Sequence, residues 1–512
     1  MPTSVTLRWY GPPTRCAPAA ILDALTPLTE RYRLRLDTRR ARTRTYLDTA
    51  DWRIRRNGLV LSHEVVTGPG SLVLHGGEEP VTARLTEPPS WPARAEQLAP
   101  GPIRDGIAGA ISVRAVAPTL RCRTVTREIA VRKADGSTVL LLEWTEATAI
   151  HPRRTPPLIR LTLRPVREDS RHTTRVARTL LATGAFTPTA ATLYDELLGT
   201  CDLPETRERP EITPDQPADS AIAAALLDCL AAMEATIDGT IDDIDPEYLH
   251  EFRVAVRRTR SLLKIAADVL PEGLADRYAS GFKALGDLTT PTRDLDVHLL
   301  ELDELAHGLT VGAPTDLAPF REHLRRCRRA ERGRLVRGLR SARFRRLLND
   351  WRTALEPLAE TGVSSLTTRR WAADRLRTVT RRVLRKARAI TPATPAEEVH
   401  GLRKRAKELR YTLEVVQPLC HPASYRKVLK DLKRLQDVLG AFQDGEVQSE
   451  HLRRYAQEML ETSPPPAATL LAMGELLAGF VRRQHEARHE LTGTLGRFLT
   501  TGTGSRLKHL LA

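Results

Sequence analysis

The chain has 512 residues, enough for two to four domains, and a formal net charge of +16. This charge attracts acidic partners: nucleic acid, inorganic phosphate polymers or anionic membrane surfaces. Only 4% of residues are aromatic, which argues against binding by base stacking. The six cysteines show neither CxxC pairs nor metal-finger spacing, which predicts a reducing compartment without a disulfide framework or a zinc site. Because signal-peptide and membrane-span patterns are missing, we expect a cytoplasmic protein.

The first 200 residues are predicted to form an α+β domain with an antiparallel sheet. Residues 119–131 and 139–146 flank the turn signal Ala134-Asp135-Gly136, which predicts a hairpin. Residues 171–183 have the pattern of a helix that Gly184 closes. Further strands are expected at 45–48, 59–64 and 157–164.

Residues 201–217 are rich in proline and charge and are interpreted as a linker. Beyond them, helical periodicity predicts an all-α region of eight to ten helices at 218–512. Asp245-Pro246 predicts an N-cap, and Thr394-Pro395-Ala396-Glu397 predicts a capping box. A repeat of 150 residues predicts two pseudo-symmetric helical bundles, at about 218–365 and 366–512. Other apolar-patterned helices are expected at 219–240, 371–389, 424–443 and 466–498.

The repeat carries a basic pattern with a histidine at its start. The first four positions of each copy fall within roughly an 80° arc of a helix and span about 15 Å. Two such stripes predict a site for a long, highly charged anion. The paired positions are His250 and His400, Arg253 and Arg403, Arg257 and Lys407, Arg260 and Arg410, then Lys283 with Lys433 and Asp294 with Asp444.

Arginine suits a phosphate polymer because its fork pairs two oxygens and stays charged. A histidine beside phosphate would have its pKa raised and could donate as well. Lys283 and Lys433 are expected to close each site from the next helix. For a single copy the alternative is a solvated helix face with ion pairs, but the ordered repetition favours a binding site. Asp294 and Asp444 are expected to hold the arginines through buried ion pairs, in preference to binding metal.

A separate run, residues 321–346, contains twelve arginines against Glu322 and Glu331. They point in many directions around a helix, so most are expected to be solvated. Two interpretations stay open: plain surface, or an extension of the anion-binding surface.

At His250-x2-Arg253-x3-Arg257-Arg258-x-Arg260 and Arg293-Asp294-Leu295-Asp296-Val297, the chain resembles the CHAD domain, the conserved histidine α-helical domain. The second copy fits at 399–414 and 432–444, and the resemblance covers about 216–512. It implies two helical bundles around a basic channel or cleft that binds inorganic polyphosphate, often at polyphosphate granules. Thr289-Thr290 stands where the family usually has Leu-Gly, which predicts a local change in the first turn. The implied binding residues are His250, Arg253, Arg257, Arg258, Arg260, Lys283, His400, Arg403, Lys407, Arg410 and Lys433.

The first 200 residues are similar to CYTH domains, the family of the triphosphate tunnel enzymes. The similarity lies in Thr45-Tyr46-Leu47-Asp48-Thr49, Asp51-Trp52-Arg53-Ile54 and Asn57-Gly58-Leu59-Val60-Leu61. The family's chemistry requires an ExExK strand, whereas SVTLRWY has no carboxylate. Glu143 and Glu146 remain, but LIRLTLR offers no acid and ATLYDE lacks the expected lysine.

Without acids to hold metal, water would not be activated, so a catalytically inactive tunnel fold is expected. The leading hypothesis is therefore a non-enzymatic polyphosphate-binding protein without metal or cofactor. The alternatives are residual metal-dependent hydrolysis of triphosphate or polyphosphate by the N-terminal half, and non-specific nucleic-acid binding through charge.

Overall fold

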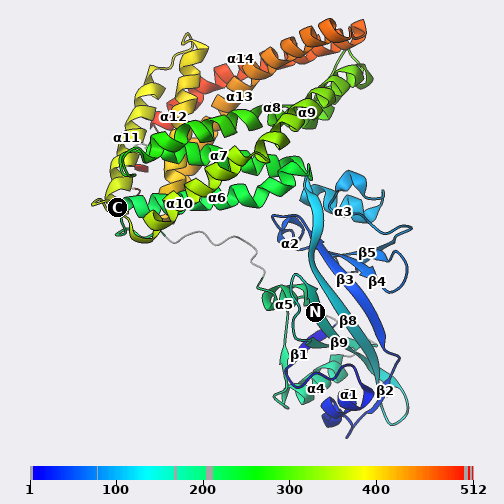
Figure 1. The fold of residues 1–512 in the computed structure, drawn as a ribbon. Coiled ribbons are helices and arrows are strands. Elements are labelled where there is room, and N and C mark those ends of the chain that lie inside the picture. The colour runs from blue at the N-terminus through cyan, green and yellow to red at the C-terminus, as the bar shows by residue number, and fades with distance from the viewer. Residues whose placement is uncertain are drawn as a thin grey trace. The chain divides into compact units, whose positions relative to one another are not determined.

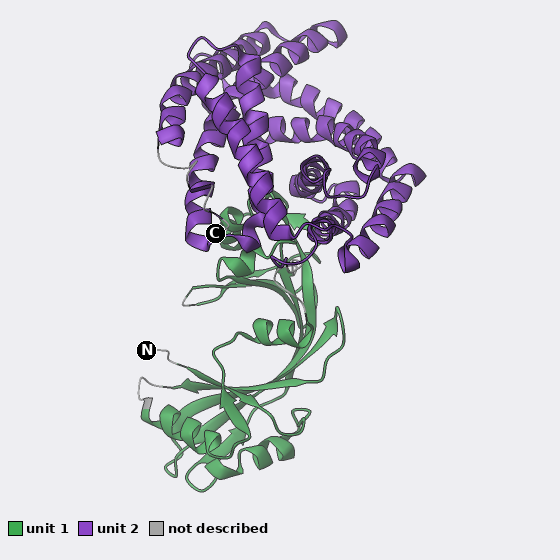
Figure 2. Ribbon diagram, turned by 90° about the vertical axis from the view of Figure 1, so that its left-hand side faces the viewer, with its two compact units in different colours: residues 1–208 green, residues 209–512 purple. Residues whose placement is uncertain are grey.

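The structure is a computed structural model that describes residues 4–77, 79–166, 170–202, 212–500, 506–507 and 510. The chain divides into two compact units, Met1–Glu208 and Arg209–Ala512 (Figure 2). The first is built around a sheet and the second is all-helical. The linker expected at 201–217 includes residues 203–211, which lie outside the described residues.

The first unit contains an antiparallel sheet of eleven strands (Figure 1). Its order is β11-β1-β10-β9-β8-β3-β4-β5-β6, with β2 and β7 also paired to β8. The expected α+β class and antiparallel sheet are confirmed. The strands are β1 (Val5–Trp9), β2 (Arg33–Leu36), β3 (Arg40–Asp48), β4 (Val60–Val65), β5 (Ser71–His75), β6 (Val81–Arg84), β7 (Ala93–Arg94), β8 (Ala115–Arg132), β9 (Thr138–His151), β10 (Leu158–Pro165) and β11 (Phe186–Pro188).

The predicted hairpin is formed by β8 and β9, the longest strands of the sheet. Its turn contains Gly136 at a φ of 84°, a left-handed conformation that glycine adopts without strain. Asp135 accepts the backbone N–H of Ser137 at 2.8 Å and closes the turn. The predicted helix at 171–183 is α4. The helices of this unit are α1 (Pro18–Ala24), α2 (Arg53–Arg56), α3 (Pro102–Ile111), α4 (Ser170–Leu181) and α5 (Leu193–Thr200).

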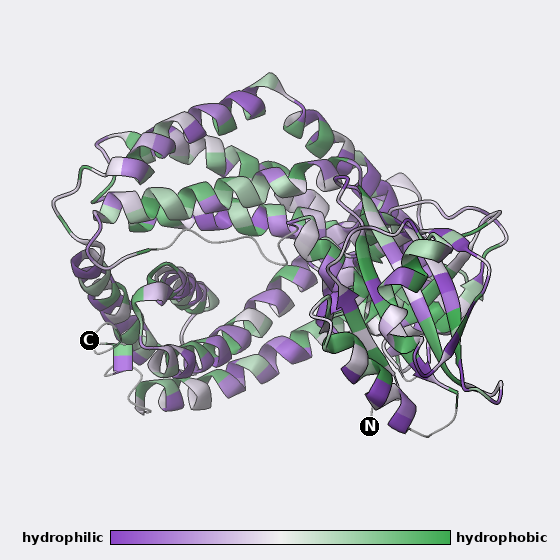
Figure 3. Ribbon diagram, turned by 90° about the horizontal axis from the view of Figure 1, so that it is seen from below, coloured by the Kyte–Doolittle hydropathy of each residue, from purple (hydrophilic) through white to green (hydrophobic). Residues whose placement is uncertain are grey.

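The second unit contains nine α-helices among the described residues, within the range that the periodicity predicts. Hydrophilic and hydrophobic residues alternate along these helices (Figure 3), as expected for helices with one buried face. The helices are α6 (Ala218–Ile241), α7 (Pro246–Ile265), α8 (Leu274–His307), α9 (Ala318–Leu339), α10 (Ala342–Thr361), α11 (Thr368–Ala389), α12 (Ala396–Val416), α13 (Pro422–Thr462) and α14 (Ala467–Thr500).

The internal repeat is visible in the helix order: α6 to α9 are followed, after α10, by α11 to α14. The two copies share their hydrophobic cores. The main core joins Phe252 and Phe282 of the first copy to Leu409 and Leu432 of the second. A smaller core joins the later parts of α8 and α13 to α9 and α14. The two copies of the basic stripe therefore belong to one packed body.

Two helix starts test the expected caps. Asp245 caps α7 as predicted, accepting the backbone N–H groups of Glu247 at 2.9 Å and Tyr248 at 3.3 Å. The capping box predicted at Thr394 is wrong: α12 has Pro395 at its N-cap and no side-chain cap. The Thr394 hydroxyl instead accepts the backbone N–H of Thr391 at 2.8 Å, a local turn that competes with capping.

Among the described helices, α6 alone has the length and apolar composition to cross a membrane. Half of its most apolar window is buried inside the fold. Its residues Leu226, Leu230 and Met233 are fully buried in the main core. A helix buried in a protein core can have the same length and apolar composition, so these properties of α6 only weakly support a membrane span.

The shared core predicts a large effect for Phe282→Ala. Phe282 is fully buried and its ring lies 5.5 Å from that of Trp351. We expect the variant to lower the free energy of unfolding of the helical unit by about 3 to 5 kcal/mol, measured by urea denaturation. Leu471→Ala, at a side chain that is 75% exposed, is the control and should change it by less than about 0.5 kcal/mol. Equal effects of the two substitutions would contradict the assignment of the core.

Candidate functional site

The two basic stripes meet because α7 and α12 contact each other. Arg258 of α7 forms an ion pair with Glu414 of α12 at 3.7 Å. A pocket of about 490 Å³ lies at this junction and takes side chains from both helices and from α11. The sequence predicted that both copies of the stripe line a common cavity. Three stripe residues do so in this pocket: Arg257 and Arg260 of the first copy and Lys407 of the second.

The pocket is strongly basic. Its charged lining consists of seven basic side chains and one carboxylate, Glu408. A second pocket of about 560 Å³ shares Lys264, Lys386 and Arg405 with it and adds Arg382 and Arg385 from α11. We call the two together the basic cleft. The basic side chains of the first pocket are Arg257, Arg260, Lys264, Lys386, Lys404, Arg405 and Lys407.

Several cations of the cleft are not neutralised. Among the described residues, no carboxylate forms an ion pair with the three paired-stripe residues Arg257, Arg260 and Lys407. Burial, followed by the charges of Arg403 and Arg257, lowers the pKa of Lys407 to about 8. The positive charge of Lys407 is therefore disfavoured first by burial and then by repulsion from Arg403 on the same helix and from Arg257 across the junction. A bound anion would relieve this repulsion, and this is the physical signature that a polyanion site requires.

Arg253 is held by neutral groups. Its Nη1 donates to the hydroxyls of Thr289 at 3.1 Å and Thr290 at 2.7 Å on α8. Burial is the main cause that lowers the pKa of Arg253. The charge of Asp294 opposes this shift, and the charge of the nearby Arg257 adds to it. These threonines replace the expected Leu-Gly, and the structure has no turn there, since α8 continues through them. The departure from the family pattern thus orients an arginine without cancelling its charge.

The two histidines sit in related settings. His400 Nδ1 donates to the Oε1 of Gln443 on α13. The matching position in the first copy is Arg293, whose charge, after burial, lowers the pKa of His250. His250 is therefore neutral near pH 7 in this structure and can donate one hydrogen bond without adding charge. Neither histidine lines the basic cleft.

Other predicted residues are tied to acidic partners. Arg410 pairs with Glu414 at 3.0 Å, the same carboxylate that receives Arg258. Lys283 is exposed and pairs with Asp287 at 2.8 Å, and Lys433 is also exposed. Lys283 and Lys433 are not among the residues lining the cleft, so the expected second wall is supplied by α11 instead.

The two aspartates do not form the pair of buried contacts expected from the sequence. Asp444 accepts from Arg403 at 3.5 Å, but its side chain is 62% exposed. Asp294 is partly buried, and its pKa is raised by this burial despite the nearby charge of Arg253. An aspartate therefore lies near Arg253 in the first copy and near Arg403 in the second, but the two aspartates differ in burial.

Six cleft residues were absent from the predicted set, because they break the 150-residue correspondence. Lys386 reaches over Gly401, where a Cβ would stand 2.6 Å from the lysine Nζ. Gly401, in the second turn of α12, was the signal that the sequence offered, because a glycine inside a helix can mark the close approach of another side chain. The six residues are Lys264, Arg382, Arg385, Lys386, Lys404 and Arg405.

The arginine run at 321–346 is mostly solvated, as expected: nine of its twelve arginines are exposed. The least exposed ones have structural partners. Arg328 pairs with Asp243 at 2.6 Å and with the buried Asp296 at 2.5 Å. None of the arginines of the run lines the basic cleft. The run is therefore interpreted as surface with local structural ion pairs.

The sheet unit has its own cavity, of about 690 Å³, on one face of the sheet. Arg40, Arg42 and Arg44 reach it from β3 at alternate positions, as residues on one face of a strand do. Two of its carboxylates are already paired. Glu64 accepts from Arg42 at 2.7 Å and from Arg44 at 2.6 Å, and Glu143 accepts from Arg164 at 2.9 Å.

Glu146 does not join the acids of this cavity. It is buried and accepts the backbone N–H of Cys16 at 2.9 Å. Because Glu143 and Glu146 are three residues apart on β9, they point to opposite faces of the sheet. Of the two carboxylates singled out on this strand, only Glu143 lines the cavity.

Residues 224–453 match the model of the CHAD domain, so the helical unit contains a CHAD domain. The match begins in α6 and ends in α13, and it includes both basic stripes. An uncharacterized protein of Mycobacterium tuberculosis, Rv2226, is 28% identical over 304 residues, which cover 56% of this chain and 55% of that protein. The chain thus spans about half the length of the curated relatives it matches.

Solved structures of similar shape match each unit. The CHAD domain of the plant Ricinus communis has a TM-score of 0.49 at 25% identity, covering 56% of this chain and 95% of that one. PptA from Streptomyces chartreusis has a TM-score of 0.45 at 16% identity, covering 55% and 100%. The Hippeastrum protein HpAC1, described as having a dominant triphosphatase activity, has a TM-score of 0.28 at 14% identity, covering 40% and 99%.

The burial of Lys407 beside Arg403 and Arg257 predicts that Lys407→Met stabilises the protein. Between pH 8 and 10.5, the unfolded lysine binds a proton that the folded one releases, so the folded state is penalised increasingly as pH falls through this window. At pH 7 the gain should be about 1 to 2 kcal/mol, after allowance for partial exposure, and it should shrink above pH 8. Urea denaturation at several pH values measures it.

Lys404→Met, at an exposed lysine of the same pocket, is the matched control. It should change the free energy of unfolding by less than about 0.5 kcal/mol at every pH. A destabilised Lys407→Met variant at pH 7 would contradict the repulsion at the junction.

Proposed function

We propose that this protein binds inorganic polyphosphate without hydrolysing it, and that the basic cleft between α7, α11 and α12 is the binding site. The main support is the group of unpaired cations around Lys407, whose pKa is lowered to about 8 by burial and by neighbouring positive charge. A flexible chain with one charge per phosphate could follow such a cleft, because each phosphate neutralises one or two cations. A location at polyphosphate granules belongs to this proposal.

The cleft favours an inorganic chain over a nucleic acid. Tyr411 is the one aromatic residue among those lining the cleft in the described structure. Recognition of single-stranded nucleic acid depends on stacking platforms, which one partly buried tyrosine does not provide. A ligand with charge and no bases matches the lining better.

Binding should depend on salt and on the cleft cations. We expect affinity for a polyphosphate of defined length to fall on the order of 100-fold between 50 and 200 mM salt, as about five phosphates release counterions. Arg257→Glu with Lys407→Glu should weaken binding by about 100-fold or more, since two charge-assisted contacts are lost. Isothermal titration calorimetry or fluorescence anisotropy measures both effects.

The matched control is Lys427→Glu with Lys430→Glu, which makes the same change in net charge at two exposed lysines of α13 outside the cleft. It should weaken binding by less than about five-fold, through the long-range field alone. Equal losses in the two double variants would show that net charge, and no particular cleft, binds the polymer. Stronger binding of DNA than of polyphosphate at matched charge would favour the nucleic-acid alternative.

The sheet unit is proposed to be catalytically inactive. Two of its three cavity carboxylates, Glu64 and Glu143, are held by arginines, which leaves only the exposed Glu128 among the described lining residues to coordinate a divalent cation. We expect the full chain to release no phosphate from tripolyphosphate above the rate without protein, with Mg²⁺ or Mn²⁺ present. A malachite-green phosphate assay measures this.

If turnover occurs, Glu64→Gln, Glu128→Gln and Glu143→Gln decide its source. Loss of the release in these variants would assign activity to the sheet cavity and contradict the proposal. Binding of polyphosphate by the helical unit would still be tested separately by the cleft variants.

A further inference from the structure

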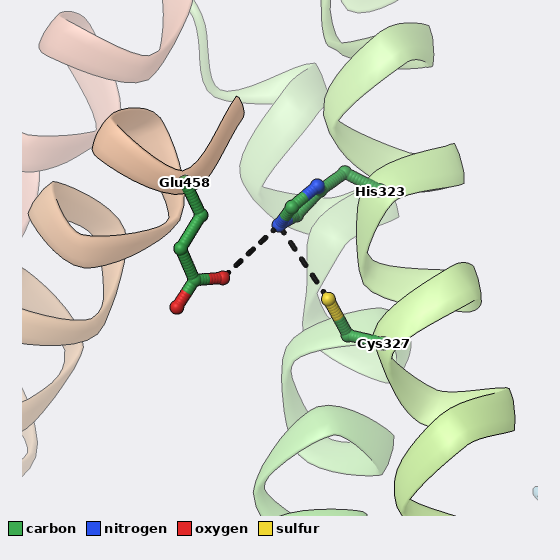
Figure 4. Close-up of side chains that lie close together, drawn as sticks. All are labelled: His323, Cys327 and Glu458. Atoms are coloured by element: carbon green, nitrogen blue, oxygen red, sulfur yellow. Dashed lines mark hydrogen bonds and ion pairs between the residues drawn. The ribbon is translucent and has the colours of Figure 1, made fainter. Parts of the chain in front are cut away.

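A cluster of three potential metal ligands lies outside the basic cleft, where α9 meets α13 (Figure 4). His323 and Cys327 are four residues apart on α9, so they share one face of that helix. Glu458 faces them from α13. The cluster borders the smaller core, with the ring of Tyr455 5.9 Å from that of His323.

The spacing of the three ligand atoms fits a single ion. His323 Nε2 is 3.4 Å from Glu458 Oε2 and 3.5 Å from Cys327 Sγ. A tetrahedral zinc ion with bonds of about 2.0 Å to nitrogen and oxygen and about 2.3 Å to sulfur has ligand–ligand edges of about 3.3 to 3.6 Å. All three ligand atoms lie within 4.8 Å of one another. Two of the three distances already match these edges, and Cys327 Sγ and Glu458 would have to approach each other from no more than 4.8 Å to about 3.5 Å.

The ligand chemistry is suitable for zinc. A thiolate and a carboxylate supply two negative charges to a dication, and a neutral imidazole completes the three protein ligands. Arg454 lies 3.6 Å from Glu458 through Oε1, which leaves Oε2 as the oxygen directed at His323. Three protein ligands leave a fourth position for water.

The competing interpretation is a small hydrogen-bonded cluster. Arg326 donates from Nη2 to His323 Nδ1 at 3.0 Å, so the Nε2 of this tautomer carries the proton. A metal on Nε2 requires that proton to move to Nδ1 and Arg326 to turn away. Arg326 is exposed, so its side chain can turn into solvent at small cost. The two interpretations therefore differ in what substitution of Arg326 does.

We propose that His323, Cys327 and Glu458 form a binding site for one Zn²⁺ ion, with a fourth position open to water. The ion joins α9 of the first repeat to α13 of the second. This site is independent of polyphosphate binding. The proposal departs from the expectation, drawn from the scattered cysteines, that the chain has no zinc site.

The experiment uses the full, untagged chain after removal of metals with a chelator. Co²⁺ is the probe, because cobalt bound to a thiolate gives a charge-transfer absorption band in the near ultraviolet. We expect one Co²⁺ per chain with this band, and displacement of the Co²⁺ by Zn²⁺. Cys327→Ser should abolish the band, and Glu458→Gln, at a side chain that is 41% exposed, should weaken binding by at least about ten-fold.

Two further variants separate the site from its alternatives. Cys420→Ser is the control, because Cys420 donates to the Val416 carbonyl at 3.1 Å, a bond that serine can keep, and the band should persist. Arg326→Gln should tighten Co²⁺ binding by about ten-fold, since it removes a positive charge and offers an acceptor to Nδ1–H. The absence of a stoichiometric band, its persistence in Cys327→Ser, or weaker binding in Arg326→Gln would overturn the proposal.

Discussion

The repulsion between cations where α7 meets α12 is the constraint on which the functional account depends. Lys407 is the clearest case, because burial, Arg403 and Arg257 together reduce its pKa to about 8. Such an arrangement costs folding free energy unless an anion is bound. The opposite faces of both helices are anchored in one core that contains Phe252 and Leu409. Hydrophobic burial therefore holds the basic faces of α7 and α12 close together, although their positive charges repel each other.

The partners of the basic groups divide the helical unit into structural and available charge. Arg328 of α9 pairs with Asp296 of α8 and stabilises the packing of these two helices, whereas Arg410 pairs with Glu414 one turn along its own helix. Arg253, which does not line the basic cleft, is positioned by the hydroxyls of Thr289 and Thr290, which orient its guanidinium without forming an ion pair. The net charge of +16 predicts a general attraction for anions, while local ion pairing determines which cations are available to one.

The sequence predicted the features that depend on local or repeated pattern: the β8–β9 hairpin, the Asp245 cap and the CHAD domain. It could not predict which cations are free, because Glu414 lies far along the chain from Arg258 and its pairing is set by tertiary packing. The cap expected at Thr394 failed because a nearer backbone N–H competes for its hydroxyl. The ligand cluster at His323 was missed for a related reason, since its carboxylate comes from another helix.

The most direct test of the central claim is the pKa of the Lys407 side chain, measured by NMR of its Nζ or neighbouring Cε nuclei, with Lys407→Arg used for assignment. We expect a pKa of about 8 for the protein alone, and a rise toward the ordinary value of 10.5 when polyphosphate is added. An ordinary pKa without the polymer, or a pKa that polyphosphate leaves unchanged, would contradict the claim that this junction holds uncompensated charge for a polyanion.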